Sequence, residues 1–296
     1  MPLLGELSAL LTACCWSGSA LAFSAATVRV GPIRLNVTRL ILASLLLFVT
    51  VVIAGIDVHL SSSQLRNLAL SGIIGLVLGD SFLFKSYEYI GARLTMLIAS
   101  VAPAISALLA YFLLGEVLSW LGVIGMFVTL FGVSIVVLER RDSFGHSQRH
   151  FGVGILYALL ASVGQGVGLV IAKMAFLEGA INGFVASLVR IATAVVVILP
   201  VAKLAGRYEN TFKVYLNDRK SMGLTLLGAF LGPYLGVTLS LVAISYTKVG
   251  IAATLMATVP IMMLPLVKYI QKEVLSWRAI VGAFVAVGGV AILFLR

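Results

Sequence analysis

Hydrophobic residues run along this chain in long blocks that short polar segments separate. Each block is about 20 residues long, the length of helix that crosses the apolar core of a bilayer. The blocks are apolar on every side and lack the alternation of an outer-membrane strand, so they indicate helices. The predicted spans are 7–28, 36–56, 67–86, 94–114, 118–138, 152–172, 184–204, 222–243, 249–270 and 276–295. The pattern therefore predicts an all-α polytopic membrane protein with ten transmembrane helices.

The composition agrees with lipid as the main solvent. Hydrophobic residues make up 61% of the chain and charged residues 11%, whereas soluble domains carry about 25% charged residues. The connections between the blocks are too short for a catalytic or nucleotide-binding domain outside the membrane. The net charge is +10, but basic loops are typical of membrane proteins, and no loop interleaves basic with aromatic residues. We expect membrane lipid as a partner and no nucleic acid.

The two halves of the chain resemble each other. The segment Glu116–Trp120, EVLSW, recurs as Glu273–Trp277. The same offset aligns further identical residues, among them Gly75 with Gly232, Gly79 with Gly236 and Pro103 with Pro260, and small gaps bring Arg39 over Arg190. This order indicates a duplicated five-helix unit, residues 1–138 and 152–296, with a polar linker at 139–151. Because five is odd, the second copy is inverted in the membrane, an architecture typical of secondary transporters.

The ordered features of the two units resemble the EamA type of the drug/metabolite transporter superfamily. They are an Arg early in the second helix, a Gly-rich third helix, a Pro within the fourth and the EVLSW block at its end. The resemblance covers about Gly5 to Leu295. It implies an exporter or exchanger of small metabolites, amino acids or drugs in the plasma (inner) membrane, coupled to a proton or a counter-substrate. It does not name the substrate.

Charged side chains inside predicted spans are candidates for function, because each costs at least about 2.5 kcal/mol in the bilayer. Arg39 and Arg190 lie a few residues inside the second and seventh spans. One interpretation is that each side chain reaches back to its nearer headgroup layer. The other is a gate. Arg39 with Glu273, and Arg190 with Glu116, or Asp80 with Arg39, would then close alternate mouths of the pathway.

Polar and aromatic groups within the spans suggest a substrate pathway. Asp80 in the third span is a candidate for carrying the coupling proton or meeting a substrate amine, unless it merely pairs with Lys85. Trp16, Gln165 and Tyr234 are expected to line a midplane cavity with it. The alternative for the aromatic residues is that they anchor span ends at the membrane interface.

Prolines and glycines recur at equivalent places. Pro103 and Pro260 are predicted in mid-helix, where each removes a backbone hydrogen bond and suits a hinge. The glycines are spaced for close contact between helices; they are Gly75, Gly79, Gly228, Gly232 and Gly236.

Some classes of protein are poorly supported by the sequence. It contains no G-x-x-x-x-G-K-[ST] segment, and the three histidines, His59, His146 and His150, fall in predicted loops. We therefore expect no metal, no cofactor and no enzyme activity. An intramembrane enzyme acting on lipid-soluble substrates, or a non-transporting scaffold, is the alternative. Lys and Arg concentrate in the loops after odd-numbered spans, which predicts that these loops are cytoplasmic and both termini outside.

Overall fold

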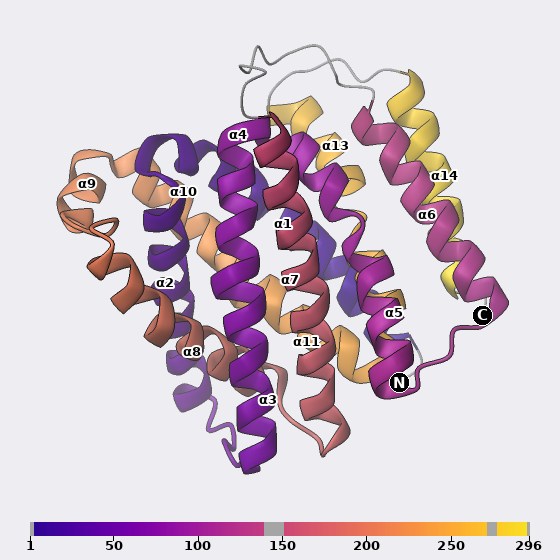
Figure 1. Ribbon diagram of the computed structural model, residues 1–296, viewed down its shortest axis with the longest axis horizontal. Coiled ribbons are helices and arrows are strands. Elements are labelled where there is room, and N and C mark those ends of the chain that lie inside the picture. The colour runs from indigo at the N-terminus through magenta and orange to yellow at the C-terminus, as the bar shows by residue number, and fades with distance from the viewer. Residues whose placement is uncertain (1–2, 139–150, 271–276, 295–296) are drawn as a thin grey trace.

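The computed structural model describes residues 3–138, 151–270 and 277–294, and within these ranges the regular elements are all helices (Figure 1). Most of the predicted linker, 139–151, and the candidate Glu273 lie outside the described residues. The elements of the first half are α1 (Leu4–Val30), α2 (Pro32–Ile53), α3 (Ser62–Gly72), η1 (Ile73–Gly79), α4 (Asp80–Ala99), α5 (Ala102–Leu114) and α6 (Trp120–Leu138). Those of the second half are α7 (Phe151–Leu177), α8 (Gly183–Leu204), α9 (Thr211–Asn217), α10 (Arg219–Ala229), η3 (Phe230–Gly236), α11 (Val237–Tyr246), α12 (Val249–Met256), α13 (Val259–Ile270) and α14 (Trp277–Phe294).

Seven helical stretches are long and apolar enough to cross a bilayer, and this confirms a multi-pass membrane protein. They are Leu4–Val30, Pro32–Ile53, Ser62–Ile90, Phe151–Leu177, Gly183–Leu204, Arg219–Tyr246 and Val249–Leu266. Shorter apolar helices occupy the places of the predicted fourth, fifth and tenth spans, at Ala102–Leu114, Trp120–Ile135 and Ile280–Ile292. Large apolar side chains such as Phe112, Phe127 and Phe284 are exposed on the outside of the bundle, as expected where lipid replaces water.

The third and fourth spans are joined inside α4. The hydroxyls of Ser86 and Thr95 lie 2.7 Å apart, although nine residues of straight helix would separate them by about 13 Å. The chain therefore reverses direction between these residues, and the long apolar stretch of the third span ends at Ile90. The gap between the predicted spans 67–86 and 94–114 falls at the same place.

Each half carries a π-helical stretch in its third span, which the sequence pattern did not predict. These stretches, η1 and η3, coincide when the two halves are aligned on their glycines. The N–H of Asp80 bonds to the carbonyl oxygen of Gly75, and the N–H of Val237 bonds to that of Gly232. Such i→i+5 bonds accommodate an extra residue in the helix and occur frequently at functional sites.

The two prolines that align between the halves lie at the starts of helices and do not kink them. The fourth span breaks at Ser100 and Val101, between α4 and α5, and the ninth breaks between α12 and α13. Pro103 and Pro260 are the second residues of α5 and α13. The first turn of a helix needs no N–H donor, so proline is tolerated there. The prediction of prolines within continuous helices is wrong, whereas a hinge at these breaks stays a prediction.

The first helix of each half packs against the third span of the other half. On α7, a Cβ added to Gly164 would lie 2.8 Å from the Cα of Gly79, and one added to Gly168 would lie 3.1 Å from the Cα of Gly75. We call this contact the glycine seam. On the opposite side, α1 places side chains against the glycines of α10 and η3: Phe23 against Gly228, Ser19 against Gly232 and Trp16 against Gly236. The five predicted packing glycines thus all lie at contacts between the halves.

The equivalent helices α1 and α7 run in opposite directions. A Cβ at Gly5, near the start of α1, would lie 3.0 Å from the carbonyl oxygen of Ala243 near the end of α11. The ammonium of Lys173, near the end of α7, donates to the carbonyl oxygens of Ile244 and Thr247 at the same end of α11. The start of α1 and the end of α7 therefore lie together, which is the arrangement that an inverted repeat predicts.

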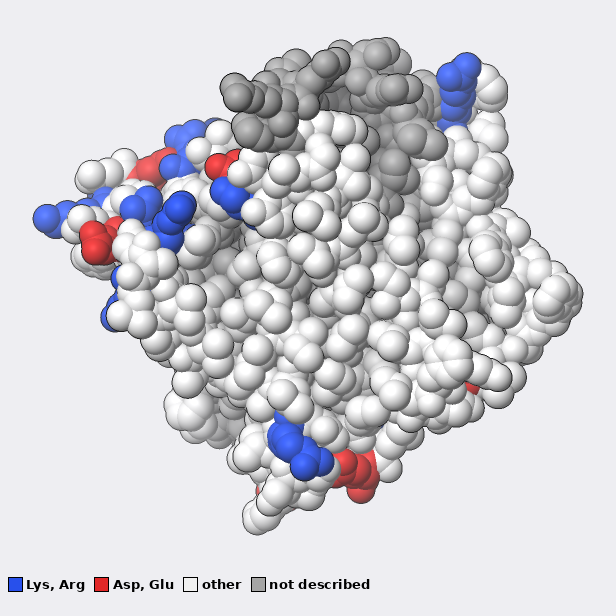
Figure 2. All heavy atoms as spheres, in the orientation of Figure 1, with Lys and Arg blue, Asp and Glu red and all other residues white. Residues whose placement is uncertain are grey.

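Basic residues gather at one end of the bundle, which we call the Arg29 face; the opposite end is the Lys173 face. Figure 2 shows Lys and Arg collected at the upper left, in the region of α9 and α10. Described basic residues at the Arg29 face include Arg29, Arg34, Lys203, Arg207, Lys213, Arg219 and Lys220, while the Lys173 face has Arg66, Lys173 and Lys248. These groups match the predicted loops, and the cytoplasmic location of the Arg29 face stays a prediction.

Candidate functional site

A cavity of about 190 Å³ lies in the middle of the bundle, where helices of both halves meet. The ends of η1 and η3 and the two breaks in the fourth and ninth spans form part of its wall. Seven of the residues singled out as pathway, charge-pair or hinge candidates line it: Trp16, Arg39, Asp80, Pro103, Gln165, Arg190 and Pro260. The structure therefore brings together residues that are far apart in the sequence.

Arg39 and Asp80 form a buried ion pair at this cavity. The two residues are 6% and 5% exposed. The carboxamide oxygen of Asn36 accepts hydrogen bonds from Arg39 Nε at 3.0 Å and Nη2 at 2.9 Å. Gln165 Nε2 donates to the second carboxylate oxygen of Asp80 at 2.6 Å. Both charges are thus matched by hydrogen bonds, as buried ions require.

Aromatic rings complete the surroundings of Arg39. Its guanidinium carbon lies 4.7 Å from the ring centre of Phe84 and 5.3 Å from that of Phe23, within the range of a cation–π interaction. The side chain therefore does not reach back to a headgroup layer, and that interpretation is wrong for Arg39. Sequence reasoning missed Phe23, Phe84 and Asn36; the signal for Asn36 was its place three residues before Arg39, on the same helix face.

Arg190 also points inward, but it lacks such a set of partners. It is the eighth residue of α8, as Arg39 is the eighth residue of α2. The residue is 3% exposed, and its Nε has no hydrogen-bond partner among the described residues. A Cβ at Gly75 would lie 3.2 Å from Arg190 Nη2, so the glycine leaves room for the guanidinium beside the cavity.

The difference between the two arginines follows from the residues around them. Asp80 follows Gly79 in the first half, whereas Val237 follows Gly236 in the second. Asn36 lies three residues before Arg39, whereas Ser187 lies three residues before Arg190, with a hydroxyl that bonds to nothing in the described part of the chain. Asp80 interacts electrostatically with Arg190, but the carboxylate is bonded to Arg39.

The predicted pair of Glu116 with Arg190 is wrong. Glu116 accepts a hydrogen bond from the N–H of Val249 at 2.8 Å, at the start of α12, where a carboxylate favours the positive end of the helix. The alternative pairing of Asp80 with Lys85 is also wrong, because Lys85 Nζ contacts Glu88 at 2.6 Å. The prediction for Glu273 stays untested.

Tyr234 is outside the cavity wall, contrary to prediction. Its hydroxyl lies 2.9 Å from Thr50 Oγ1, and its ring packs on Phe184 and Phe230. The cavity side of η3 is formed by Gly232 and Pro233 instead. Tyr234 was predicted from its aromatic and polar character alone, and it lies inside the π-helical stretch η3, where the angular position of successive side chains differs from that of an α-helix.

A cluster of charged residues lies at the Lys173 face of the bundle. Thr247 Oγ1 donates to Glu6 at 3.1 Å, and the ammonium of Lys248 donates to the carbonyl oxygen of Val117. Lys173 binds the carbonyl oxygens at the end of α11, where a cation favours the negative end of the helix. The sequence placed Lys173 in a loop, and its burial to 9% exposure was not predicted.

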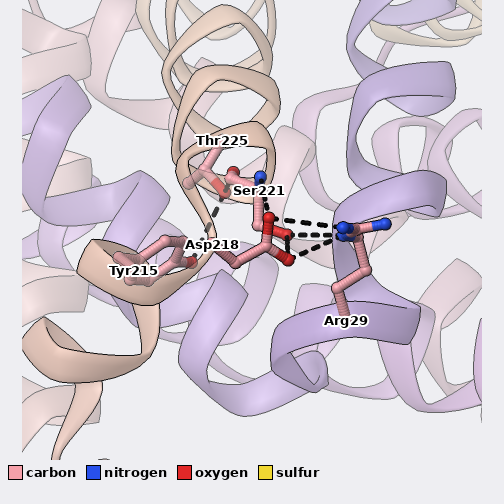
Figure 3. Close-up of polar contacts among 5 residues, drawn as sticks. All are labelled: Arg29, Tyr215, Asp218, Ser221 and Thr225. Atoms are coloured by element: carbon pink, nitrogen blue, oxygen red, sulfur yellow. Dashed lines mark hydrogen bonds and ion pairs between the residues drawn. The ribbon is translucent and has the colours of Figure 1, made fainter.

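Two polar latches join the first helix of each half to the third span of the other. At the Arg29 face, Arg29 Nε contacts Asp218 at 2.7 Å, and Asp218 accepts from the N–H and hydroxyl of Ser221 at 3.1 and 2.7 Å (Figure 3). The bonds from Arg29 hold the pKa of Asp218 well below its usual range. Thr225 donates to Tyr215 beside this latch.

The second latch lies at the Lys173 face. There Glu178 accepts hydrogen bonds from Ser61 at 3.2 Å, Ser63 at 2.6 Å and Asn67 at 3.1 Å. The charge on the first-helix side is therefore positive in one latch and negative in the other. Neither latch was predicted from the sequence.

No group of three or more His, Cys, Asp or Glu side chains that would suit a metal ion occurs over residues 3–138, 151–270 and 277–294.

Comparisons with known proteins agree with this architecture. The model of the EamA-like transporter family matches residues 3–138 and 152–295, one match for each half. A protein chain solved by crystallography is similar in fold, with a TM-score of 0.80 and 20% sequence identity over 100% of this chain and 98% of that chain. A search among curated proteins finds no match to the sequence.

Proposed function

Because this chain belongs to the EamA-like transporter family, whose members are transporters and not enzymes, we propose that it is a secondary transporter of small metabolites, amino acids or drugs. It works as an exporter or exchanger in the plasma (inner) membrane. In this proposal the seven long and three shorter apolar helices form ten spans, arranged as two inverted repeats of five.

The observation that carries the proposal is the central cavity with its buried charges. It lies between two halves whose equivalent helices run in opposite directions, and both halves supply an arginine to its wall. Inverted halves can exchange conformations and so expose a midplane site to each side in turn. A buried charge costs stability, and a static scaffold has no need of two arginines there.

The breaks in the fourth and ninth spans suit the moving parts of this cycle. The two breaks have equivalent backbone hydrogen bonds: the N–H of Val101 donates to the carbonyl oxygen of Ile98 at 3.1 Å, and the N–H of Thr258 donates to that of Leu255 at 3.2 Å. Chain segments at such breaks absorb changes in backbone angle more readily than continuous helix does. Pro103 and Pro260 restart the helices beside the cavity and act as hinges.

The Arg39 and Asp80 pair is the proposed gate toward the Arg29 face. Opening the gate separates the two charges. The freed carboxylate of Asp80 then binds the coupling proton, or a counter-substrate takes its place beside Arg39. The cluster around Lys173 closes the other mouth. Replacing Asp80 by Asn removes the titrating group but keeps its size, so the pH dependence of transport is expected to disappear.

Solute flux in proteoliposomes that contain only this protein tests the proposal. Wild-type protein is expected to accelerate exchange of a loaded amino acid or drug mixture over protein-free vesicles. The double variant Arg39→Ala, Arg190→Ala is expected to lose this activity, while Gly288→Ala, at a position with nothing near its added Cβ, serves as the matched control. Absence of flux in the wild type, or full flux in the double variant, would contradict the proposal.

A further inference from the structure

The charges on the cavity wall do not balance. Of the described residues that line it, Arg39, Asp80 and Arg190 carry charge. Arg39 and Asp80 are bonded to each other and neutralise each other. Arg190 remains as one surplus positive charge in an almost fully buried position. A buried ion without a bonded counter-ion destabilises the protein, so an anionic ligand that neutralises this charge is expected to bind more tightly than a neutral one.

Arg190 lies on the cavity wall, and its Nε is buried without a hydrogen-bond partner among the residues the structure describes. The guanidinium can therefore donate to a ligand in the cavity. Gly75 offers no side chain to cover the group, and Val237 on the neighbouring wall supplies no oxygen. Arginine presents its donors as a planar fork that matches the two oxygens of a carboxylate.

The remaining wall favours an organic anion with an apolar or aromatic part. Trp16, Phe23, Phe84 and Tyr87 line the same cavity, and aromatic rings pack well against another ring or a short apolar chain. The volume of about 190 Å³ exceeds the roughly 150 Å³ of a cavity that holds benzene. One surplus charge matches a carboxylate better than a phosphate monoester, which carries about two negative charges at neutral pH.

We infer that Arg190 binds the carboxylate of a small organic monoanion, whose apolar part lies against the aromatic wall of the cavity. This inference rests on the proposed transport function and names its substrate class. The first half of the repeat satisfies its arginine with Asp80, and in the second half the substrate carboxylate takes that place.

Three probes of similar size and different charge test the inference on the purified full-length protein in detergent. Benzoate at neutral pH is expected to bind and to raise the thermal stability of the protein. Benzamide, which is neutral, and benzylamine, which is cationic, are expected to bind at least about tenfold more weakly, because a charge-assisted bond is lost or reversed. Sodium chloride at the same concentration is the control for a general salt effect.

Two variants locate the binding site. Arg190→Met removes the guanidinium, and Val237→Asp supplies the missing carboxylate within the protein. Each is expected to weaken benzoate binding by about tenfold to a hundredfold. Val237→Asn, which matches the size of Val237→Asp but carries no charge, is expected to retain much more of the affinity than Val237→Asp. Equal binding of benzoate and benzamide, or wild-type affinity for benzoate in folded Arg190→Met and Val237→Asp, would overturn the inference.

Flux measurements separate this inference from the transport proposal. Benzoate binding that depends on Arg190, in a protein that moves no solute in proteoliposomes, would support the anion site and contradict transport. If other solutes are transported, but benzoate neither inhibits their flux nor is transported itself, the result would support transport and overturn the carboxylate assignment. Inhibition of flux by benzoate in the wild type, lost in Val237→Asp, would support both.

Discussion

Arg39 and Arg190 occupy the same position in the two halves of the molecule, yet their surroundings differ. Arg39 is bonded to Asp80 and Asn36 and lies against two aromatic rings. Arg190 is equally buried, and Val237 stands where the first half has its carboxylate. Duplication thus placed an arginine on both sides of the cavity, and later divergence left one side neutral and the other positively charged.

This comparison separates two roles that a buried charge can have. The Arg39 pair contributes to the closed structure, because both ions are matched inside the protein. Arg190 costs stability in the unliganded protein, and such costs concentrate at sites that bind or react. The Arg39 and Asp80 pair, whose charges are matched, is therefore the better candidate for a gate. Arg190, whose charge is not matched by a bonded partner, is the better candidate for binding a ligand.

The largest expected effect comes from breaking the Arg39 pair. Asp80→Leu leaves Arg39 buried without its counter-ion and is expected to lower the free energy of unfolding by about 3–5 kcal/mol. Adding Arg39→Met is expected to recover most of that loss. Arg190→Met has no pair to break and is expected to leave stability unchanged or to raise it. Unfolding measured in detergent distinguishes these results, and a loss for Arg190→Met as large as for Asp80→Leu would contradict the comparison.

The glycine seam tests the two halves in another way. In Gly164→Ala the new methyl group meets the backbone of Gly79, which cannot move alone, and a loss of about 1–3 kcal/mol is expected. In Gly236→Ala its closest contact is the side chain of Trp16, which lines the cavity and can shift into it, and the nearest backbone atom is the carbonyl oxygen of Leu231 at 3.0 Å, so the loss is expected to be smaller.

Gly288→Ala is the matched control for this pair, since no atom lies within 4 Å of its added Cβ. Its unfolding in detergent should stay close to that of the wild type. A larger loss of stability in Gly236→Ala than in Gly164→Ala would contradict the expectation that the backbone contact of α7 tolerates an added methyl group less well than the contact of α1 with Gly236.

The smallest effect is expected at the latch of the Arg29 face, because its residues are partly exposed and salt screens them. Asp218→Asn should lower the melting temperature slightly at neutral pH and less at high salt. The pKa of Asp218 is lowered in the folded protein. Its contribution is therefore fully present above its unfolded pKa, near 4, declines below that value and is lost only as the pH falls through the lowered pKa of the folded protein. The melting temperatures of wild type and variant should therefore begin to approach each other below about pH 4 and meet only at a pH below the lowered pKa of Asp218; a difference that does not shrink at all below about pH 4 would exclude the latch as its cause.

Sequence reasoning found much of the cavity because its signals were local. Charges within apolar blocks are few, so Arg39, Arg190 and Asp80 stood out before any contact was known. Trp16 and Gln165 emerged from their places in the first helices. Tyr234 and Glu116 were misplaced, because the direction of one side chain depends on a π-helical stretch and the partner of the other is the backbone of α12.

The sequence by itself determined that lipid is the main solvent, that the chain is duplicated and where its helices lie, since these follow from hydrophobic blocks of bilayer length and from repeated residues. Only the tertiary structure decided which charges are matched. Arg39 and Asp80 are 41 residues apart, and the missing hydrogen-bond partner of Arg190 Nε among the described residues is evident only once the surrounding helices are packed. Whether a buried charge is a structural pair or a binding group depends on these distances, and an amino-acid order does not contain them.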